Sequence, residues 1–343
     1  MIRSLPITDF LSVPHPVIDV RSPGEFAQGH VPGAHNVPLF TNEERAVVGT
    51  LYKQQGRDAA VLQGLRLVGP KLAAITERAV ELAPDGRIRV HCWRGGERSG
   101  SVAWLLDKAG FAEVLPLIGG YKAFRNHVLA SFAVPRKLAV VGGHTGTGKT
   151  EILSHLAALG QHTIDLESLA NHKGSSFGAL GEPPQPTNEQ FENAVWGALH
   201  ACDPREVVWI EDESGSIGRV KIPDAFFRTM RGSPCYFLEV PKPMRASRLV
   251  EGYGGFPRMQ LIQATERIAK RIGPQHCKAA VEALHNNDLY TAAMITLTYY
   301  DKTYLHGVGQ RDPDRVFRTA VEHQYLKDVA GQLIEAHAAF RYE

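Results

Sequence analysis

The stretch Leu138-Ala139-Val140-Val141-Gly142-Gly143-His144-Thr145-Gly146-Thr147-Gly148-Lys149-Thr150 decides the fold of the larger part of this 343-residue chain. Apolar residues 138–141 predict a buried strand, and residues 151–159 predict the helix that follows. The glycines and Lys149-Thr150 have the full Walker A spacing, in the strand-to-helix context that this loop requires. Main-chain amides of such a loop surround a phosphate chain, while its lysine neutralises terminal oxygens. The stretch predicts an α/β domain that binds a diphosphate through Gly143, Thr145, Gly146, Thr147, Gly148, Lys149 and Thr150.

Further strands of this domain are predicted at residues 163–166, 207–210 and 235–240. Two acidic groups follow them: Asp165 and Glu167 after one strand, Glu211 and Asp212 after the next. Either group is a candidate for the carboxylate that a hydrolytic nucleotide site needs, and either can be merely structural, as a solvated acidic turn for example. A magnesium ion near Thr150 is the one metal that the sequence suggests.

A second anion-handling loop, His91-Cys92-Trp93-Arg94-Gly95-Gly96-Glu97-Arg98-Ser99, lies earlier in the chain. It follows a strand predicted at 87–91 and precedes a helix predicted at 99–109, so Cys92 sits at the carboxyl end of a parallel strand, where α/β folds bind ligands. Arg94, Arg98 and the helix dipole favour the thiolate, and Gly95-Gly96 allows inward N–H donors. Cys92 is thus a candidate nucleophile, although an inert buried cysteine is the bland reading. The pattern His-Cys-x5-Arg-Ser also fits cysteine phosphatases.

A basic stretch runs from Glu266 to Lys278. Its basic residues fall at helical intervals opposite Ile268 and Ile272, and they are Arg267, Lys270, Arg271 and Lys278. Such a stripe can neutralise RNA phosphates, whereas a solvated charged face is the commoner explanation for any one helix. The candidates for tRNA contact are Arg245, Arg248, Arg258, Arg267, Lys270 and Arg271.

Composition bounds the remaining possibilities. A chain of 343 residues predicts two domains, and a net charge of +2 excludes a simple, highly basic nucleic-acid binder. The four cysteines show neither disulfide nor zinc spacing, which favours a reducing compartment. No signal peptide or membrane-spanning run is visible. We expect a cytoplasmic protein with no membrane association and no tightly bound cofactor.

The segment before the cysteine loop resembles the first part of rhodanese domains. The residues that carry this resemblance are Asp19-Val20-Arg21-Ser22-Pro23-Gly24-Glu25-Phe26 and Gly29-His30-Val31-Pro32-Gly33-Ala34-His35-Asn36-Val37-Pro38. The resemblance spans about residues 5–130 and favours a sulfur or selenium carrier over a phosphatase. It implies a rhodanese-like domain at 1–133, followed by a P-loop NTPase-like parallel-sheet domain at 134–343 with a helical C-terminal part. Asp19 reads as half of a structural salt bridge.

Residues 165–178 and Glu211-Asp212-Glu213-Ser214, together with the two loops, resemble the bacterial tRNA 2-selenouridine synthases nearly from end to end. The resemblance implies a transferase that replaces the sulfur of 2-thiouridine at the wobble position of tRNA, position 34, with selenium from selenophosphate. It also implies an S-geranyl intermediate made with geranyl diphosphate. Cys92 would then carry or present selenium, and the Walker A loop would hold the diphosphate of the prenyl donor.

Two other readings stay open. One is an ATP-dependent RNA or nucleotide kinase fused to a sulfurtransferase, with ATP in the glycine loop. The other is a regulatory module that couples a rhodanese-like sensor to a P-loop switch.

Overall fold

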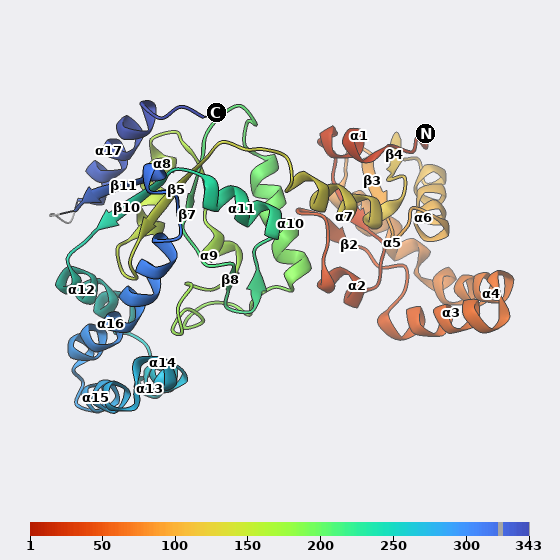
Figure 1. The fold of residues 1–343 in the computed structure, drawn as a ribbon. Helices are drawn as coiled ribbons and strands as arrows, with labels where there is room; N and C mark the ends of the chain where they lie inside the picture. Colours follow the sequence, from red (N-terminus) through yellow and green to blue (C-terminus); the bar gives the residue numbers. More distant parts are fainter. Residues whose placement is uncertain (322–324, 343) are drawn as a thin grey trace. The chain divides into compact units, whose positions relative to one another are not determined.

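The chain folds into two compact units, Met1–Ser131 and Phe132–Glu343, so the division falls two residues before the boundary expected at 133/134 (Figure 1). The computed structural model describes residues 1–321 and 325–342. Both units are α/β layers, which confirms the predicted fold class. Within the described residues, no helix combines the length and the apolar character needed to cross a membrane.

The first unit is built on a parallel four-stranded sheet of order β2-β1-β3-β4. Its strands are β1 Val17–Asp19, β2 His35–Asn36, β3 Arg87–His91 and β4 Glu113–Pro116. Its helices are α1 Ile7–Ser12, α2 Pro23–Gln28, α3 Asn42–Gln55, α4 Arg57–Val68, α5 Leu72–Leu82, α6 Glu97–Lys108 and α7 Gly120–Ser131, with the 3-10 turn η1 Gly69–Lys71 before α5.

Apolar side chains of β1, β3 and β4 pack against those of α5 and α6 to form the core of this unit. Ile18, Ile88, Val90 and Leu106 are completely buried there. In β3 the buried Ile88 and Val90 alternate with Arg87 and Arg89, which is the period-two pattern of a strand. This core fixes the carboxyl end of β3, from which the cysteine loop starts.

The second unit has a parallel five-stranded sheet of order β11-β10-β5-β7-β6. Its strands are β5 Leu138–Gly143, β6 His162–Ile164, β7 Val208–Glu211, β10 Cys235–Glu239 and β11 Val316–Ala320, and a small antiparallel pair is formed by β8 Ser216–Ile217 and β9 Val220–Lys221. Its helices are α8 Lys149–Ala158, α9 Leu166–Leu169, α10 Asn188–His200, α11 Asp224–Gly232, α12 Lys242–Tyr253, α13 Arg258–Arg267, α14 Ala269–Ile272, α15 Pro274–His285, α16 Leu289–Val308 and α17 Leu326–Ala338, with the 3-10 turn η2 Pro313–Arg315 before β11.

Two details of the C-terminal part differ from the sequence prediction. Strand β11 pairs with β10 at the sheet edge, where a purely helical region was expected; its residues are largely exposed, so it gives no buried run to recognise. The basic stretch is not one helix, because α13 ends at Arg267 and Gly273, at φ +89°, separates α14 from α15. Helices α12 to α16 gather at one end of this unit (Figure 1).

Candidate functional site

Cys92 lies at the first position after β3, at the base of a loop that leads into α6. Its side chain is only 3% exposed. Gly95 at φ +67° and Gly120 at φ +58° bring the loop and the start of α7 together: a Cβ on Gly120 would lie 2.4 Å from the Cys92 carbonyl oxygen and from the Gly95 nitrogen. The glycines therefore let two backbone segments touch directly beneath the thiol.

The surroundings of Cys92 favour the thiolate. Burial raises the pKa of the thiol, but hydrogen bonds from the Ser99 side chain and from the backbone amides of Ser99 and Arg94, with the charge of Arg98, bring the pKa below its usual value. The Sγ to Ser99 Oγ distance is 3.2 Å. A thiol with a lowered pKa is the reactive kind, so the structure favours a functional cysteine over an inert one.

The remaining residues of the cysteine loop divide into exposed and paired groups. Arg94, Gly95 and Gly96 are exposed, as an anion site requires. The Arg98 guanidinium instead bonds the Glu25 carboxylate at 2.7 Å, which links the loop to α2. Asp19 and Arg21 form a fully buried ion pair, Nη2 to Oδ2 2.6 Å, and the guanidinium lies 3.7 Å from the Tyr121 ring centroid.

The Walker A residues form a cradle between β5 and α8 in the second unit. Gly146 and Gly148 have φ of +81° and +84°, and a Cβ on Gly148 would lie 2.1 Å from the Arg248 guanidinium. The Lys149 ammonium donates to the Gly143 carbonyl at 3.2 Å, while buried Thr147 donates to the His144 carbonyl at 2.9 Å. A cleft of about 2180 Å³, part of it open to solvent, is lined by residues 145–150 of this loop.

Carboxyl groups that follow two strand ends, Glu167 and Glu213 among them, line the same cleft, whereas Glu211 is completely buried. Glu167 accepts from the Thr150 hydroxyl at 3.3 Å, and its backbone amide donates to buried Glu211 at 2.8 Å. The pKa values of Glu167 and Glu211 are both raised, and burial is the largest cause in each case. Because Glu211 is completely buried and accepts this backbone hydrogen bond, the group is not a solvated acidic turn.

Glu213 completes this group. Burial, reinforced by the negative charge of Glu167, raises its pKa to about 8 against the opposing charge of Lys149, and a hydrogen bond joins the two glutamates. Asp165 has a structural task, because its carboxylate accepts from the Ser168 amide at 2.7 Å and caps α9.

Asp212 differs from the other carboxyl groups. It is 5% exposed and accepts from Arg311 at 2.5 Å and from the Tyr304 hydroxyl at 3.2 Å. Asp212 lines the cleft, as a possible acidic site there requires, but its carboxylate is already paired with Arg311. Within residues 1–321 and 325–342, no three or more His, Cys, Asp or Glu side chains are arranged to hold a metal ion.

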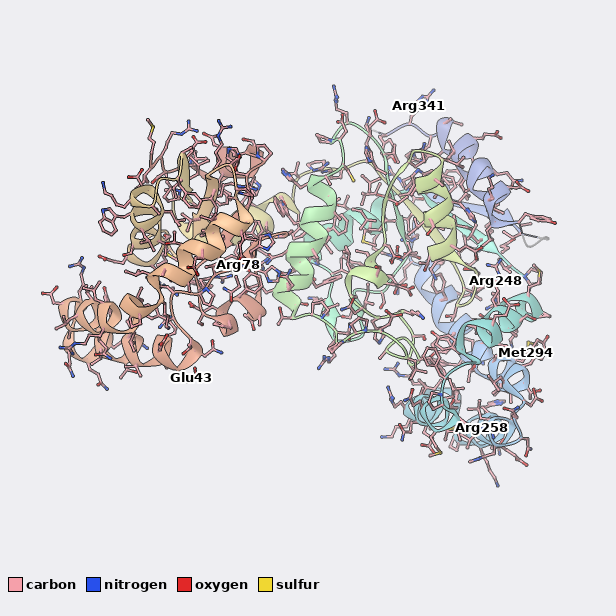
Figure 2. All side chains as sticks on the ribbon, turned by 180° about the vertical axis from the view of Figure 1, so that it is seen from behind. Glu43, Arg78, Arg248, Arg258, Met294 and Arg341 are labelled. Carbon is pink, nitrogen blue, oxygen red and sulfur yellow. The ribbon has the colours of Figure 1, made fainter. Side chains whose placement is uncertain are left out.

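The candidate RNA-binding residues do not form one stripe. Arg245 is buried and forms a two-pronged pair with Asp301, 2.8 and 2.9 Å, so it is removed from any RNA surface. Arg248 donates to the Thr147 carbonyl at 3.1 Å and thereby supports the cradle. Figure 2 shows Arg248 on α12 and Arg258 on α13. Arg258, Arg267, Lys270 and Arg271 are exposed, and Arg271 also lines the cleft.

Several cleft residues have no recognisable sequence pattern. Tyr304 and Tyr300 come from α16, Tyr253 from α12 and Arg231 from α11. The Lys149 ammonium lies 5.3 Å from the Tyr304 ring centroid. Glu213 belongs to the acidic sequence that follows strand β7. That position after a buried strand was the sequence feature that pointed to a place in the site.

The fold and the two sites define an α/β protein that joins a rhodanese-like domain to a P-loop domain. Residues 9–127 match the rhodanese-like domain family, and residues 136–265 match the family described as the tRNA 2-selenouridine synthase AAA domain. A protein from Shewanella loihica named tRNA 2-selenouridine synthase is 34% identical over 92% of this chain and 94% of its own length. The chain belongs to the tRNA 2-selenouridine synthase family.

Two further similarities cover less of the chain or of the relative. The tRNA 2-selenouridine synthase of Bdellovibrio bacteriovorus is 40% identical over 69% of this chain and 64% of its own length. The solved N-terminal domain of a putative ATP/GTP binding protein from Clostridium difficile 630 is 42% identical to this chain. The match covers 37% of this chain and 99% of the solved domain, with a TM-score of 0.35.

The carboxyl pair predicts a pH dependence of diphosphate binding. Glu213 has a pKa raised to about 8, so it is neutral at pH 7 and becomes anionic as the pH rises to 9. If the Walker A loop holds a diphosphate beside Lys149, the new charge repels it, so the affinity for inorganic diphosphate measured without Mg²⁺ should fall about tenfold over this interval. Calorimetric titrations at pH 7 and pH 9 measure it.

The variant Glu213→Gln should lose that fall in affinity and keep only the ligand's own titration. Glu251→Gln, at an exposed position of α12, is the matched control and should behave as the wild type. Equal pH profiles for Glu213→Gln and wild type would contradict the role of Glu213.

Proposed function

We propose that this enzyme replaces the sulfur of 2-thiouridine at the wobble position of tRNA with selenium from selenophosphate, through an S-geranyl intermediate made with geranyl diphosphate. One observation carries the proposal: a thiol with a lowered pKa and a phosphate cradle occur in one chain of the tRNA 2-selenouridine synthase family. Two activated anionic donors require two anion sites, and each unit supplies one.

The cradle supports the first step. The thione sulfur attacks C1 of the geranyl group, the C–O bond breaks, pyrophosphate leaves, and N3 of the base gives up its proton. Lys149 and the loop amides face the charge that grows on the departing diphosphate, which is where fixed positive charge lowers a barrier most. If Mg²⁺ takes part, Thr150 and Glu167 are the residues in place to hold it beside the diphosphate, since this ion favours carboxylate, phosphate and water oxygens.

The cysteine loop supports the second step. Alkylated sulfur leaves as a neutral thiol, so geranylation prepares C2 of the base for selenium. Selenium in selenophosphate is already at the oxidation level of selenide, so no oxidant is needed. The selenium forms the C–Se bond as the C–S bond breaks, geranylthiol departs with a proton, and water takes the phosphoryl group as phosphate when the P–Se bond breaks. In this proposal Cys92 presents selenium, and Arg94 with the loop amides holds the anionic donor. Exposed Arg258, Arg267, Lys270 and Arg271 are the proposed contacts to tRNA phosphates.

Nucleoside mass spectrometry tests the proposal directly. Purified enzyme is incubated with 2-thiouridine tRNA and geranyl diphosphate, selenophosphate, both, or ATP. We expect S-geranyl-2-thiouridine with the first donor alone and 2-selenouridine when both are present. Consumption of ATP without any geranylated nucleoside would instead support the kinase reading and overturn the proposal.

A further inference from the structure

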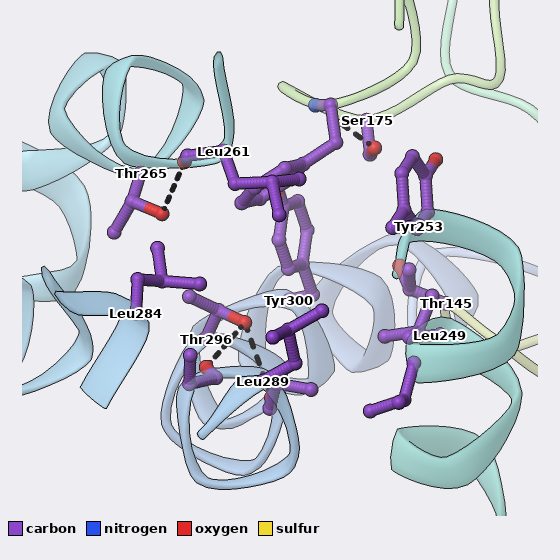
Figure 3. Close-up of a pocket in the computed structure, with 14 residues that line it drawn as sticks. Thr145, Ser175, Leu249, Tyr253, Leu261, Thr265, Leu284, Leu289, Thr296 and Tyr300 are labelled. Atoms are coloured by element: carbon purple, nitrogen blue, oxygen red, sulfur yellow. Dashed lines mark hydrogen bonds between the residues drawn. The ribbon is translucent and has the colours of Figure 1, made fainter. Parts of the chain in front are cut away.

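An apolar cavity adjoins the phosphate cleft of the second unit (Figure 3). Its volume is about 560 Å³ when the open space at its mouth is counted, and its lining is almost entirely apolar. Helices α12, α13, α15 and α16 and the loop after α9 form its walls.

The cavity and the cleft share one boundary. Thr145, Ser175, Leu249, Tyr253 and Tyr300 line both of them. Thr145 belongs to the Walker A loop itself, so the mouth of the cavity lies at the phosphate cradle. One ligand can therefore place its anionic end on the loop amides and an apolar tail in the cavity.

The deeper wall is hydrocarbon. Leu261, Leu284 and Leu289 line it (Figure 3), together with the small side chains Ala292 and Ala293 of α16. These alanines create the room, because larger residues there would close it. A cavity of this composition offers too few polar groups to hold water well.

The two threonines in this wall do not change its character. The Thr265 hydroxyl donates to the Leu261 carbonyl at 2.9 Å, and the Thr296 hydroxyl to the Ala292 carbonyl at 3.0 Å. Both hydroxyl hydrogens are thus used inside their own helices. A purine, which needs partners for its polar edge, fits this wall less well than a hydrocarbon.

The loop after α9 closes the cavity on one side. The Ser176 amide donates to the Tyr300 hydroxyl at 3.1 Å, and the Ser176 side chain donates to the Ala264 carbonyl at 2.9 Å. These bonds tie the loop to α16 and α13. Hydrogen bonds between the loop and the two helices therefore hold this side of the cavity in place.

We propose that this cavity binds the isoprenoid tail of the allylic diphosphate, and that the wall formed by Leu261, Leu284, Leu289 and Ala293 sets the accepted chain length. The inference rests on the proposed function, since it takes the diphosphate to lie in the Walker A loop. It adds a binding site and a source of specificity, with no additional covalent step.

The test compares diphosphates that differ only in the tail, by calorimetry on the full chain. Wild-type protein should bind geranyl diphosphate tighter than methyl diphosphate by on the order of 10²-fold, because the tail leaves water. Ala293→Leu, which fills the cavity, should bring the two affinities within about tenfold. Methyl diphosphate affinity should stay unchanged, which also shows that the variant is folded.

A second variant enlarges the same cavity. Leu289→Ala should shift the preference from geranyl toward farnesyl diphosphate by about tenfold. The matched controls are Ala279→Leu, at an exposed position of α15, and Leu305→Ala, at an exposed position of α16 outside the cavity; both should bind like the wild type. If Ala293→Leu does not fold, the shift of Leu289→Ala from geranyl toward farnesyl diphosphate tests the cavity assignment, and an unchanged preference would overturn it.

The possible results distinguish a failure of the cavity assignment from a failure of the proposed function. Equal wild-type affinity for geranyl and methyl diphosphate would overturn the cavity assignment and leave the phosphate cradle intact. Tighter binding of adenosine diphosphate than of geranyl diphosphate would overturn it in favour of a purine. Failure to bind any diphosphate would overturn the proposed function itself.

Discussion

Replacement of Cys92 by alanine should reduce conversion of geranylated tRNA to 2-selenouridine by at least about 10³-fold, because removal of a reactive group typically costs this much or more. Geranylation of 2-thiouridine tRNA by the same variant should continue at the wild-type rate. The sulfur is 3% exposed, so its loss leaves a small cavity and costs about 1 kcal/mol of stability. Nucleoside mass spectrometry after each half-reaction, with a thermal unfolding curve, measures all three effects.

Cys202→Ala is the matched control. That cysteine is also buried and free, but burial raises the pKa of its thiol, whereas the pKa of Cys92 is lowered. The control should keep both half-reactions within about twofold of wild type. An undiminished rate of selenation in Cys92→Ala would show that the cysteine has no part in that step.

Replacement of Lys149 by alanine should slow geranyl transfer by about 10²–10³-fold, the usual effect of removing one donor to a developing anion. The ammonium now donates to the Gly143 carbonyl at 3.2 Å, at the edge of the cradle where terminal phosphate oxygens would lie. A charge-assisted contact to the leaving diphosphate would be lost. Single-turnover geranylation, measured by nucleoside mass spectrometry, gives the rate.

Two comparisons make this result specific. Lys137→Ala removes an exposed lysine of the same unit, just before β5, and should leave geranylation unchanged. Lys149→Ala supplied with tRNA that is already geranylated should still incorporate selenium at the normal rate. Normal geranylation by Lys149→Ala would disconnect the Walker A loop from the alkylation.

The sequence predicted those elements whose pattern is local. Strand β3 is predicted at its observed bounds because Ile88 and Val90 alternate with arginines directly before a glycine-rich loop. The strand β5 and helix α8 are predicted from a continuous apolar run before such a loop. In both places the chemistry follows directly from the strand, so the candidate nucleophile and the phosphate cradle could be found without a structure.

Features that depend on distant segments could not be predicted. Arg245 appeared to be a basic surface residue until the structure placed it against Asp301, 56 positions later. Asp212 similarly meets Arg311, 99 positions away. The apolar cavity combines residues from Thr145 to Tyr300, each of which alone reads as ordinary helix or loop. The local pattern of apolar and polar residues carries no information about contacts between segments so far apart in the sequence.

The buried pair of Asp19 and Arg21 constrains how this protein can change. Both side chains have no exposed surface, and the Arg21 guanidinium also donates to the Gly29 carbonyl at 2.6 Å. Loss of either partner alone leaves an unpaired charge in the interior and lowers the free energy of unfolding by about 3–5 kcal/mol. Exchange of both residues for apolar ones can leave the stability nearly unchanged. Substitutions at these two positions should therefore be strongly epistatic, with each single mutant less stable than the double mutant.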